Sequence, residues 1–366
     1  MSAPVRRSAA LPALGVWLAS RVALALLTLA GAWQLTGTRR LLDGWDSWDV
    51  TLFRKIAEFG YDGYPVHYPD SEVAAFFPGF PLVLRVVHGL VPDWTAAGLL
   101  ASLLAGSVAV VALSRLAELD GVDGSRAALY LVLSPYAVFL AAGYSESLFL
   151  ALALTGWLAG RRGSWPAAGL LVAASCLVRV SGLFLAVALV VLFLTSRPVR
   201  WRAAAPWLAA PFLALLGWAS YLHHLSGDWL RWQHTQAAGW GRHLTGPVQA
   251  LQATYDASRS PSLGAEYHWS FRAEIVAVGI GVLVTAVLLG RRRWAEATYV
   301  GLSVGALATS TYYLSVARAT LLWFPLWLLL AEAAGRRRWV HPVYLAVSAP
   351  LMVVVVLTFT AGRWVG

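Results

Sequence analysis

Charged residues are scarce in this chain. Asp, Glu, Lys and Arg make up 13% of its 366 residues, and 59% of the chain is hydrophobic, whereas a soluble domain averages about 25% charged residues. Apolar runs of membrane-spanning length recur from one end of the sequence to the other. The composition therefore excludes an ordinary soluble domain. It predicts an all-α polytopic membrane protein, built as one integral membrane domain over residues 1–366.

Cysteine and lysine are nearly absent. The single cysteine, Cys176, excludes an internal disulfide and a cysteine-based metal site, and its apolar surroundings predict a buried side chain. Lys55 is the only lysine, so the net charge of +10 comes from arginine. These arginines form short clusters between apolar runs, a pattern typical of membrane topology signals. We therefore expect no nucleic-acid partner.

Motifs for nucleotides and metals are also missing. The sequence has no G-x-x-x-x-G-K-[ST] loop and no G-x-G-x-x-G after a predicted strand, so it predicts no nucleotide-binding loop. Its eight histidines show no spacing with an acid that is typical of metal ligands. We expect neither a metal nor another cofactor.

The arginine clusters predict the topology. They lie at Arg6, Arg7, Arg115, Arg126, Arg161, Arg162, Arg197, Arg200, Arg202, Arg291–Arg293 and Arg336–Arg338. Such clusters beside apolar spans mark the cytoplasmic side. The predicted spans are 11–33, 95–116, 126–142, 145–160, 165–178, 182–196, 203–222, 273–290, 294–311, 319–334 and 341–360. This topology describes a plasma-membrane protein of about eleven spans with a cytoplasmic N-terminus and an uncleaved first span.

Several predicted spans are unusually short. They have roughly 15 residues, whereas a helix needs about 20 to cross the hydrocarbon core. Their outer ends carry polar residues, at Tyr144–Glu146, Arg179 and Ser315–Arg318. Short spans are tolerated where their ends line a wet cavity instead of lipid. The sequence thus predicts a cavity that opens outward and is partly sunk into the membrane.

Two long segments fall on the outer side. In residues 34–94, the stretch 49–59 places Leu52, Ile56 and Phe59 on one face of an amphipathic helix. Four prolines in residues 64–82 predict a loop or bent re-entrant backbone there. The second segment, residues 223–272, is rich in Trp, His, Gln and Gly and is a candidate cover for the cavity.

Five charged residues are candidates for chemistry. Asp46 and Asp49 are three residues apart and would share a helix face; either could be a general base or a helix cap. Glu146 at the start of a span could cap the helix or contact sugar hydroxyls. Arg179 and Arg318 interrupt apolar runs, and a membrane-embedded arginine needs a partner. That partner could be an acid such as Glu146 or a lipid phosphate.

The order of these motifs resembles the GPI mannosyltransferase 2 (PIG-V type) family of the GT-C glycosyltransferases. The similar blocks are Trp48-Asp49 with Phe53, Ile56-Ala57-Glu58, Gly60-Tyr61, AFFPGFPL at 75–82, SPYAVFLAAGYSESLF at 134–149, Val178-Arg179 with Ser181-Gly182, and Ala317-Arg318 before Pro325. The resemblance extends over most of the chain. Ser181 departs from it, because family members typically have Asn at that position.

The resemblance implies a GT-C helix bundle and an inverting glycosyltransferase. The implied donor is mannose on a polyprenyl phosphate, not a nucleotide sugar, and the implied base is an acid of the first outer loop, here Asp49. Arg179 and Arg318 would hold the donor phosphate. Contacts to the sugar or acceptor are expected from Asp46, Glu146, Tyr144, Phe77, His234, Gln236 and Tyr312. The arginine and alanine excess suggests a GC-rich genome, so the expected acceptor is a bacterial glycolipid or cell-envelope glycan.

Three alternatives remain open from the sequence. The same fold could transfer another polyprenyl-linked sugar, such as glucose or arabinose. The chain could be a lipid or glycan transporter, although the paired half-repeats of many transporters are not evident. It could also be a pseudoenzyme that keeps only the fold. Membrane lipids are expected neighbours, and a monomer is the expected state.

Overall fold

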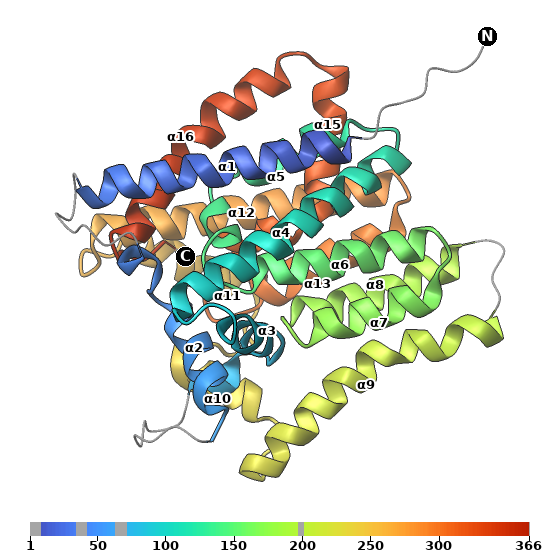
Figure 1. Ribbon diagram of the computed structural model, residues 1–366, viewed down its shortest axis with the longest axis horizontal. Coiled ribbons are helices and arrows are strands. Elements are labelled where there is room, and N and C mark those ends of the chain that lie inside the picture. Colours follow the sequence, from blue (N-terminus) through green and yellow to red (C-terminus); the bar gives the residue numbers. More distant parts are fainter. Residues whose placement is uncertain (1–8, 34–41, 63–71, 197–200, 366) are drawn as a thin grey trace.

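A computed structural model describes residues 9–33, 42–62, 72–196 and 201–365 (Figure 1). Over these residues the fold is helical. Its sole β feature there is an isolated antiparallel bridge between Leu244 and Ser310. The prediction of an all-α protein is confirmed.

Five helices are long and apolar enough to cross a membrane, judged by length and composition over the described residues. They are α1 (Ala10–Gly31), α4 (Trp94–Leu119), α9 (Trp201–Ser226), α12 (Ala265–Gly290) and α16 (Val340–Thr360). A bent pair near the C-terminus makes a sixth if it counts as one span. The chain therefore has the helices of a multi-pass membrane protein, and the count of about eleven stays a prediction.

The remaining predicted spans fall on shorter helices. These are α5 (Gly124–Val132), α6 (Glu146–Arg161), α7 (Trp165–Cys176), α8 (Ser181–Thr195), α13 (Trp294–Ala308) and α15 (Phe324–Arg336). Helices α1, α4, α6, α7 and α9 each pack against the next in that order, and α8 packs against α13 (Figure 1). The short helices thus lie inside the bundle, beside longer helices.

Two predicted spans are wrong as continuous helices. Span 126–142 breaks after α5 at Ser134-Pro135, because a residue that precedes proline disfavours helical dihedral angles, and the chain resumes as η4 (Ala137–Leu140). Span 319–334 starts with α14 (Val316–Ala319) and η5 (Thr320–Leu322), then bends by 73° into α15. Pro325 lies in the first turn of α15, where a proline suits a helix start.

Arginines from two of the clusters that predicted the cytoplasmic side, Arg161 and Arg291–Arg293, lie together at one end of the bundle. Arg161 and Arg293 both donate to the Asp120 carboxylate, at 2.7 and 2.8 Å. Arg293 also pairs with Glu296 at 2.9 Å, and Arg291 pairs with Glu332. These groups come from loops and helix ends far apart in sequence, and they line a second, smaller cavity of about 430 Å³ at this end of the molecule.

The opposite end carries the first long outer segment. Its elements are η2 (Asp43–Trp45), α2 (Asp49–Phe59), η3 (Glu72–Ala75) and α3 (Gly79–His88). Helix α2 has the predicted bounds. Of the residues predicted to share one face, Ile56 is buried, and Leu52 and Phe59 are partly buried. Val50, Phe53 and Ala57 are buried as well, and the Phe53 ring packs against the rings of Phe76, Phe80 and Tyr144.

The predicted loop over residues 64–82 is wrong at its end, where residues 79–82 already belong to α3. Pro81 is tolerated there because a proline in the first helical turn removes no intrahelical hydrogen bond. Pro65 and Pro69 lie outside the described residues. The second outer segment contains the end of α9, then α10 (Arg231–Trp240), α11 (Pro247–Ala257) and the start of α12.

The Phe-Pro-Gly-Phe motif has a glycine, Gly79, where two backbone segments come into close contact. Its N–H donates to the Leu177 carbonyl at 2.7 Å. A Cβ at this position would lie 2.7 Å from Val178 Cγ2 and 2.8 Å from the Leu177 oxygen. The start of α3 therefore approaches the α7–α8 loop too closely for any side chain.

We predict that Gly79→Ala lowers stability by about 1–3 kcal/mol, the usual cost of forcing a methyl group into a packed site. The melting temperature in detergent measures the effect. Gly15→Ala is the matched control, because a Cβ at Gly15 meets nothing within 4 Å. Equal melting temperatures for the two variants would contradict the close-contact explanation.

Candidate functional site

A cavity of about 790 Å³ lies where the short helices end. Its wall includes Asp49 at the start of α2, Ser145 before α6, Arg179 between α7 and α8, and Arg318 of α14. The break after α13 adds Thr309, Ser310, Tyr312, Leu314 and Ser315. The polar ends of the short spans therefore converge on one cavity, as the span lengths predicted.

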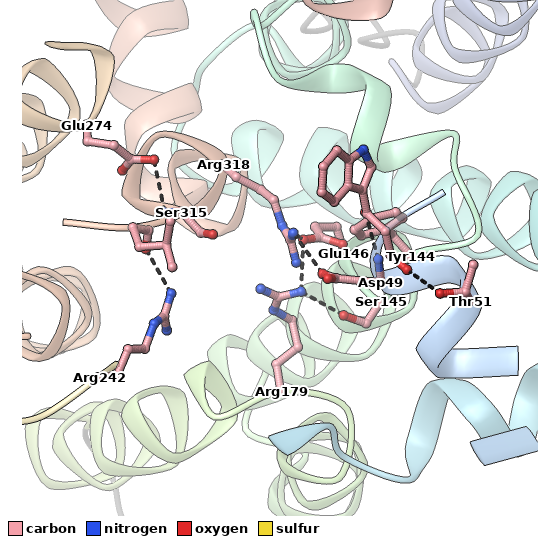
Figure 2. A network of polar contacts seen from close by, with 12 residues as sticks. Asp49, Thr51, Tyr144, Ser145, Glu146, Arg179, Arg242, Glu274, Ser315 and Arg318 are labelled. Atoms are coloured by element: carbon pink, nitrogen blue, oxygen red, sulfur yellow. Dashed lines mark hydrogen bonds and ion pairs between the residues drawn. The ribbon is translucent and has the colours of Figure 1, made fainter. Parts of the chain in front are cut away.

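Arg318 connects two acids from distant parts of the chain (Figure 2). Its Nη1 donates to Asp49 Oδ2 at 3.0 Å, and its Nε donates to Glu146 Oε1 at 2.5 Å. Its guanidinium lies 4.8 and 4.9 Å from the ring centroids of Phe139 and Tyr144. Charge pairing and ring contacts thus fix the Asp49 carboxylate at the cavity wall.

Glu146 is the shared acid beneath this wall. Arg179 Nη1 also donates to Glu146 Oε1, at 2.8 Å, and to Ser145 Oγ at 2.7 Å. The sequence allowed either an acid such as Glu146 or a lipid phosphate as the partner of Arg179 and Arg318. In the structure both arginines pair with Glu146. Glu146 is fully buried and does not line the cavity, so it supports the site from behind and makes no part of its surface.

Two neighbours set the position of Asp49. The Asp49 N–H donates to the Tyr144 hydroxyl at 3.3 Å. Burial raises the pKa of the Tyr144 phenol well above its usual range, so this hydroxyl stays protonated. Trp48, just before Asp49, has φ +59°, a conformation that costs a non-glycine residue on the order of 1–3 kcal/mol. The turn into α2 is therefore strained at the residue that precedes the candidate base.

The loop that carries Arg318 is held by a second buried acid, Glu274 of α12. Its carboxylate accepts the N–H groups of Ser315, Val316 and Ala317 at 2.9, 2.6 and 3.0 Å (Figure 2). Ser315 has φ +60°, so this loop is also strained. Our sequence analysis missed Glu274, although an acid within an apolar run was a detectable signal.

Three further predicted contact residues line the cavity: Phe77, Gln236 and Tyr312. The Gln236 side-chain amide donates to the Ala75 carbonyl at 3.3 Å, and the Tyr312 hydroxyl donates to the Trp240 carbonyl at 3.0 Å. Residues of the segment 223–272 therefore form part of the cavity wall, together with Tyr144.

Two predicted contact residues lie elsewhere. Asp46 pairs with Arg54 at 2.8 Å and does not line the cavity. The expectation that it shares a helix face with Asp49 is wrong, because α2 begins only at Asp49. His234 is exposed outside the cavity, and its ring nitrogen lies 2.7 Å from Asp228 Oδ2.

Among the described residues, no group of three His, Cys, Asp or Glu side chains is placed to hold a metal ion. Cys176 is buried. The expectation that the chemistry needs no metal stays a prediction from the sequence.

The fold and this site define a multi-pass membrane protein whose carboxylate–guanidinium centre lies at the ends of short helices. Residues 35–197 match the family model described as Mannosyltransferase (PIG-V). This match confirms the resemblance over that part of the chain. The matched region contains Asp49, Tyr144, Glu146 and Arg179, whereas Arg318 lies beyond it.

The similar curated proteins are mannosyltransferases. GPI alpha-1,6-mannosyltransferase 2 of Rattus norvegicus and that of Homo sapiens are each 38% identical over 156 residues, which are 39% of this chain. GPI mannosyltransferase 2 of Yarrowia lipolytica is 52% identical over 56 residues, 15% of this chain and 16% of its own length. The match spans 30% of the length of the rat and human relatives. No solved structure matches.

Proposed function

We propose that this protein is an inverting mannosyltransferase of the extracytoplasmic membrane surface, and that it is a plasma-membrane protein with a cytoplasmic N-terminus. It transfers mannose from a polyprenyl-phosphate donor to a glycolipid or cell-envelope glycan. The observation that carries the proposal is the Asp49 carboxylate, held by Arg318 at the wall of a cavity among helix ends. The names of the matched relatives support mannose as the sugar.

The reaction begins when Asp49 accepts the proton of an acceptor hydroxyl. That oxygen attacks the anomeric carbon of a β-linked mannosyl phosphate from the opposite face and forms an α-mannoside. The bond between this carbon and the phosphate oxygen breaks, and its electron pair leaves with the polyprenyl phosphate. The proton then passes from Asp49 to water. A positioned base of this kind contributes about 10²- to 10⁴-fold to the rate.

The arginines supply the positive charge that the leaving phosphate requires. Departure of the sugar adds one negative charge to the phosphate, and preorganised donors in a dry site stabilise such charge strongly. Arg179 uses Nη1 on Glu146 and Ser145 and lines the cavity. Arg318 donates from Nε to Glu146 and from Nη1 to Asp49. Arg179 is therefore the stronger phosphate contact of the pair, and Arg318 mainly positions Asp49.

The cavity belongs to one end of the molecule, which supports transfer over transport. At the other end, Arg161, Arg293 and Asp120 form the ion-paired group described above. A transporter needs access from both sides to one central site. The site here combines a base with cations at a single face, an arrangement suited to chemistry.

The test is mannose transfer by the purified chain in lipid nanodiscs. Labelled polyprenyl phosphomannose and a glycolipid acceptor extract are the substrates, with GDP-mannose and polyprenyl phosphoglucose in parallel. The proposal predicts a new labelled α-mannoside from the polyprenyl phosphomannose alone. Turnover of the glucose donor alone would show that the transferred sugar is glucose and not mannose. Labelled lipid that crosses proteoliposome membranes without forming a glycoside would identify a transporter.

Arg179→Gln is expected to raise the KM for the donor about tenfold, equivalent to about 1.4 kcal/mol, with a smaller effect on kcat. Steady-state kinetics in nanodiscs measure the change. Arg54→Gln is the matched control, because Arg54 pairs with Asp46 outside the cavity. A donor KM that does not change in Arg179→Gln would remove Arg179 from the phosphate site.

A further inference from the structure

Arg242 is a third arginine in the cavity wall, and the sequence did not single it out. It follows α10 and lines the cavity together with Asp49, Arg179 and Arg318. Figure 2 shows Arg242 across from Arg179 and Arg318, on the far side of the group from Asp49. The cavity therefore has cationic side chains on two sides.

The three arginines differ in their partners. Arg318 pairs with two carboxylates and Arg179 with one. Among the described residues, Arg242 has no carboxylate within ion-pair distance. Its Nη2 donates to the Leu314 carbonyl at 3.0 Å, and its buried Nε has no hydrogen-bond partner there.

An unpaired guanidinium at this depth is costly. Burial lowers the pKa of Arg242, because the charged form loses hydration. The nearest buried acid in Figure 2, Glu274, uses its carboxylate on three backbone N–H groups of the loop between them. A partly buried charge without a carboxylate partner at a cavity wall is a candidate binding group for an anionic ligand.

The backbone that follows Arg242 is held by two hydrogen bonds. The His243 N–H donates to Thr311 Oγ1 at 2.9 Å, and the Thr245 N–H donates to the Thr309 carbonyl at 2.7 Å. These bonds attach the segment after α10 to the loop that leads to Arg318. The guanidinium is therefore presented to the cavity by a braced backbone, as a preorganised binding group must be.

We infer that Arg242 binds the phosphate of the lipid-linked donor, on the side of the cavity away from Asp49. The inference rests on the proposed function. A phosphodiester between Arg242 and Arg179 would supply Arg242 with the counter-charge that no carboxylate of the described residues gives it, and its sugar would extend toward Asp49. Guanidinium matches phosphate in shape as well as charge, because it donates parallel hydrogen bonds to two oxygens. The positive charge on Arg242 then stabilises the phosphate as the sugar departs.

The test compares Arg242→Gln and Arg242→Lys with Arg259→Gln. Arg259 is exposed, lies outside the cavity and stacks on Tyr255 at 4.7 Å, so its variant controls for loss of one positive charge. The probe is farnesyl phosphate, which carries the phosphate and prenyl chemistry of the leaving group, with farnesol as the uncharged comparison. Thermal shift in nanodiscs gives the affinity of each variant for the probe.

We expect Arg242→Gln to bind farnesyl phosphate at least about tenfold more weakly than wild type, with Arg242→Lys between them. Without ligand, Arg242→Gln should melt no lower than wild type, because the change removes an unpaired buried charge. Unchanged affinity would overturn the inference. A lower melting temperature with unchanged affinity would also overturn it. Arg242 would then have a structural role, through its hydrogen bond to the Leu314 carbonyl.

Kinetics separate this inference from the proposed function and from a phosphate on the acceptor. A donor KM raised about tenfold in Arg242→Gln, with the acceptor KM unchanged, supports the donor phosphate. An increase confined to the acceptor KM would overturn that assignment. If wild type binds farnesyl phosphate through Arg242 but transfers no mannose, the anion site stands and the proposed function fails. If Arg242→Gln turns over with unchanged KM values, only this inference fails.

Discussion

Asp49→Asn is expected to reduce mannose transfer by about 10²- to 10⁴-fold, the range for loss of a general base. Asn keeps the shape of the side chain and an oxygen that can accept from Arg318 Nη1, now 3.0 Å from Asp49 Oδ2. It cannot take a proton from an acceptor hydroxyl. Single-turnover transfer from labelled donor measures the chemical step, and retention of labelled donor measures binding, which should be nearly unchanged.

Asp46→Asn is the control for this prediction. Asp46 is three residues away, pairs with Arg54 and does not line the cavity, so its variant should keep substantial activity. Full activity in Asp49→Asn would remove the base assignment. Loss of activity only in Asp46→Asn would move the base to the other carboxylate and contradict the geometry of the α2 start.

Glu146→Gln is expected to lower stability by about 3–5 kcal/mol, the usual cost of removing one member of a buried ion pair. The fully buried Glu146 accepts from both Arg179 and Arg318. Without this charge, Arg179 has no ion pair among the described residues, and Arg318 keeps only its pair with Asp49. The melting temperature should fall sharply, and transfer activity should fall with it because Arg318 no longer fixes Asp49.

Two further variants test the cause of that loss. Glu58→Gln, at an exposed position of α2, should melt close to wild type. The double variant Glu146→Gln with Arg179→Gln should recover part of the stability, because it also removes one of the unpaired cations. If Glu146→Gln unfolds no earlier than Glu58→Gln, the shared-acid description is incorrect.

The cavity could be predicted from sequence because it follows from local properties of the spans. Helices too short to cross a bilayer, with polar residues at one end, have few stable arrangements other than a shared hollow. The bounds of α2 were also local, since its apolar pattern covers a single short helix. The buried face of α2 could not be predicted from its own sequence, because the helix has two sets of apolar residues at helical spacing. Phe53 is buried because it packs against rings of distant segments.

The contacts that make the site required the structure. Asp49 and Arg318 are 269 residues apart, and no spacing rule pairs them. The separation of Asp46 from Asp49 depends on the positive φ of Trp48, which the Trp-Asp-Ser-Trp-Asp pattern does not reveal. Arg242 became a candidate only when the structure placed it at the cavity without a carboxylate partner among the described residues. In the sequence it is one arginine within a polar stretch.

The family match and the site overlap only in part. Residues 35–197 contribute Asp49, Glu146 and Arg179, while Arg242, Glu274 and Arg318 come from the later part of the chain. Of the two proposed phosphate contacts, Arg179 lies inside the matched region and Arg242 beyond it. Differences among relatives in donor or acceptor use would be expected to concentrate there.

The structure of the Asp49→Asn variant with polyprenyl phosphomannose bound, determined by electron cryomicroscopy in nanodiscs, tests the central claim most directly. We predict density for the phosphate between Arg242 and Arg179. The anomeric carbon should face the residue 49 side chain, with room for an acceptor oxygen at about 3–3.5 Å from that carbon. Donor density at the end that carries Asp120 and Arg293, or a sugar that points away from residue 49, would contradict the account.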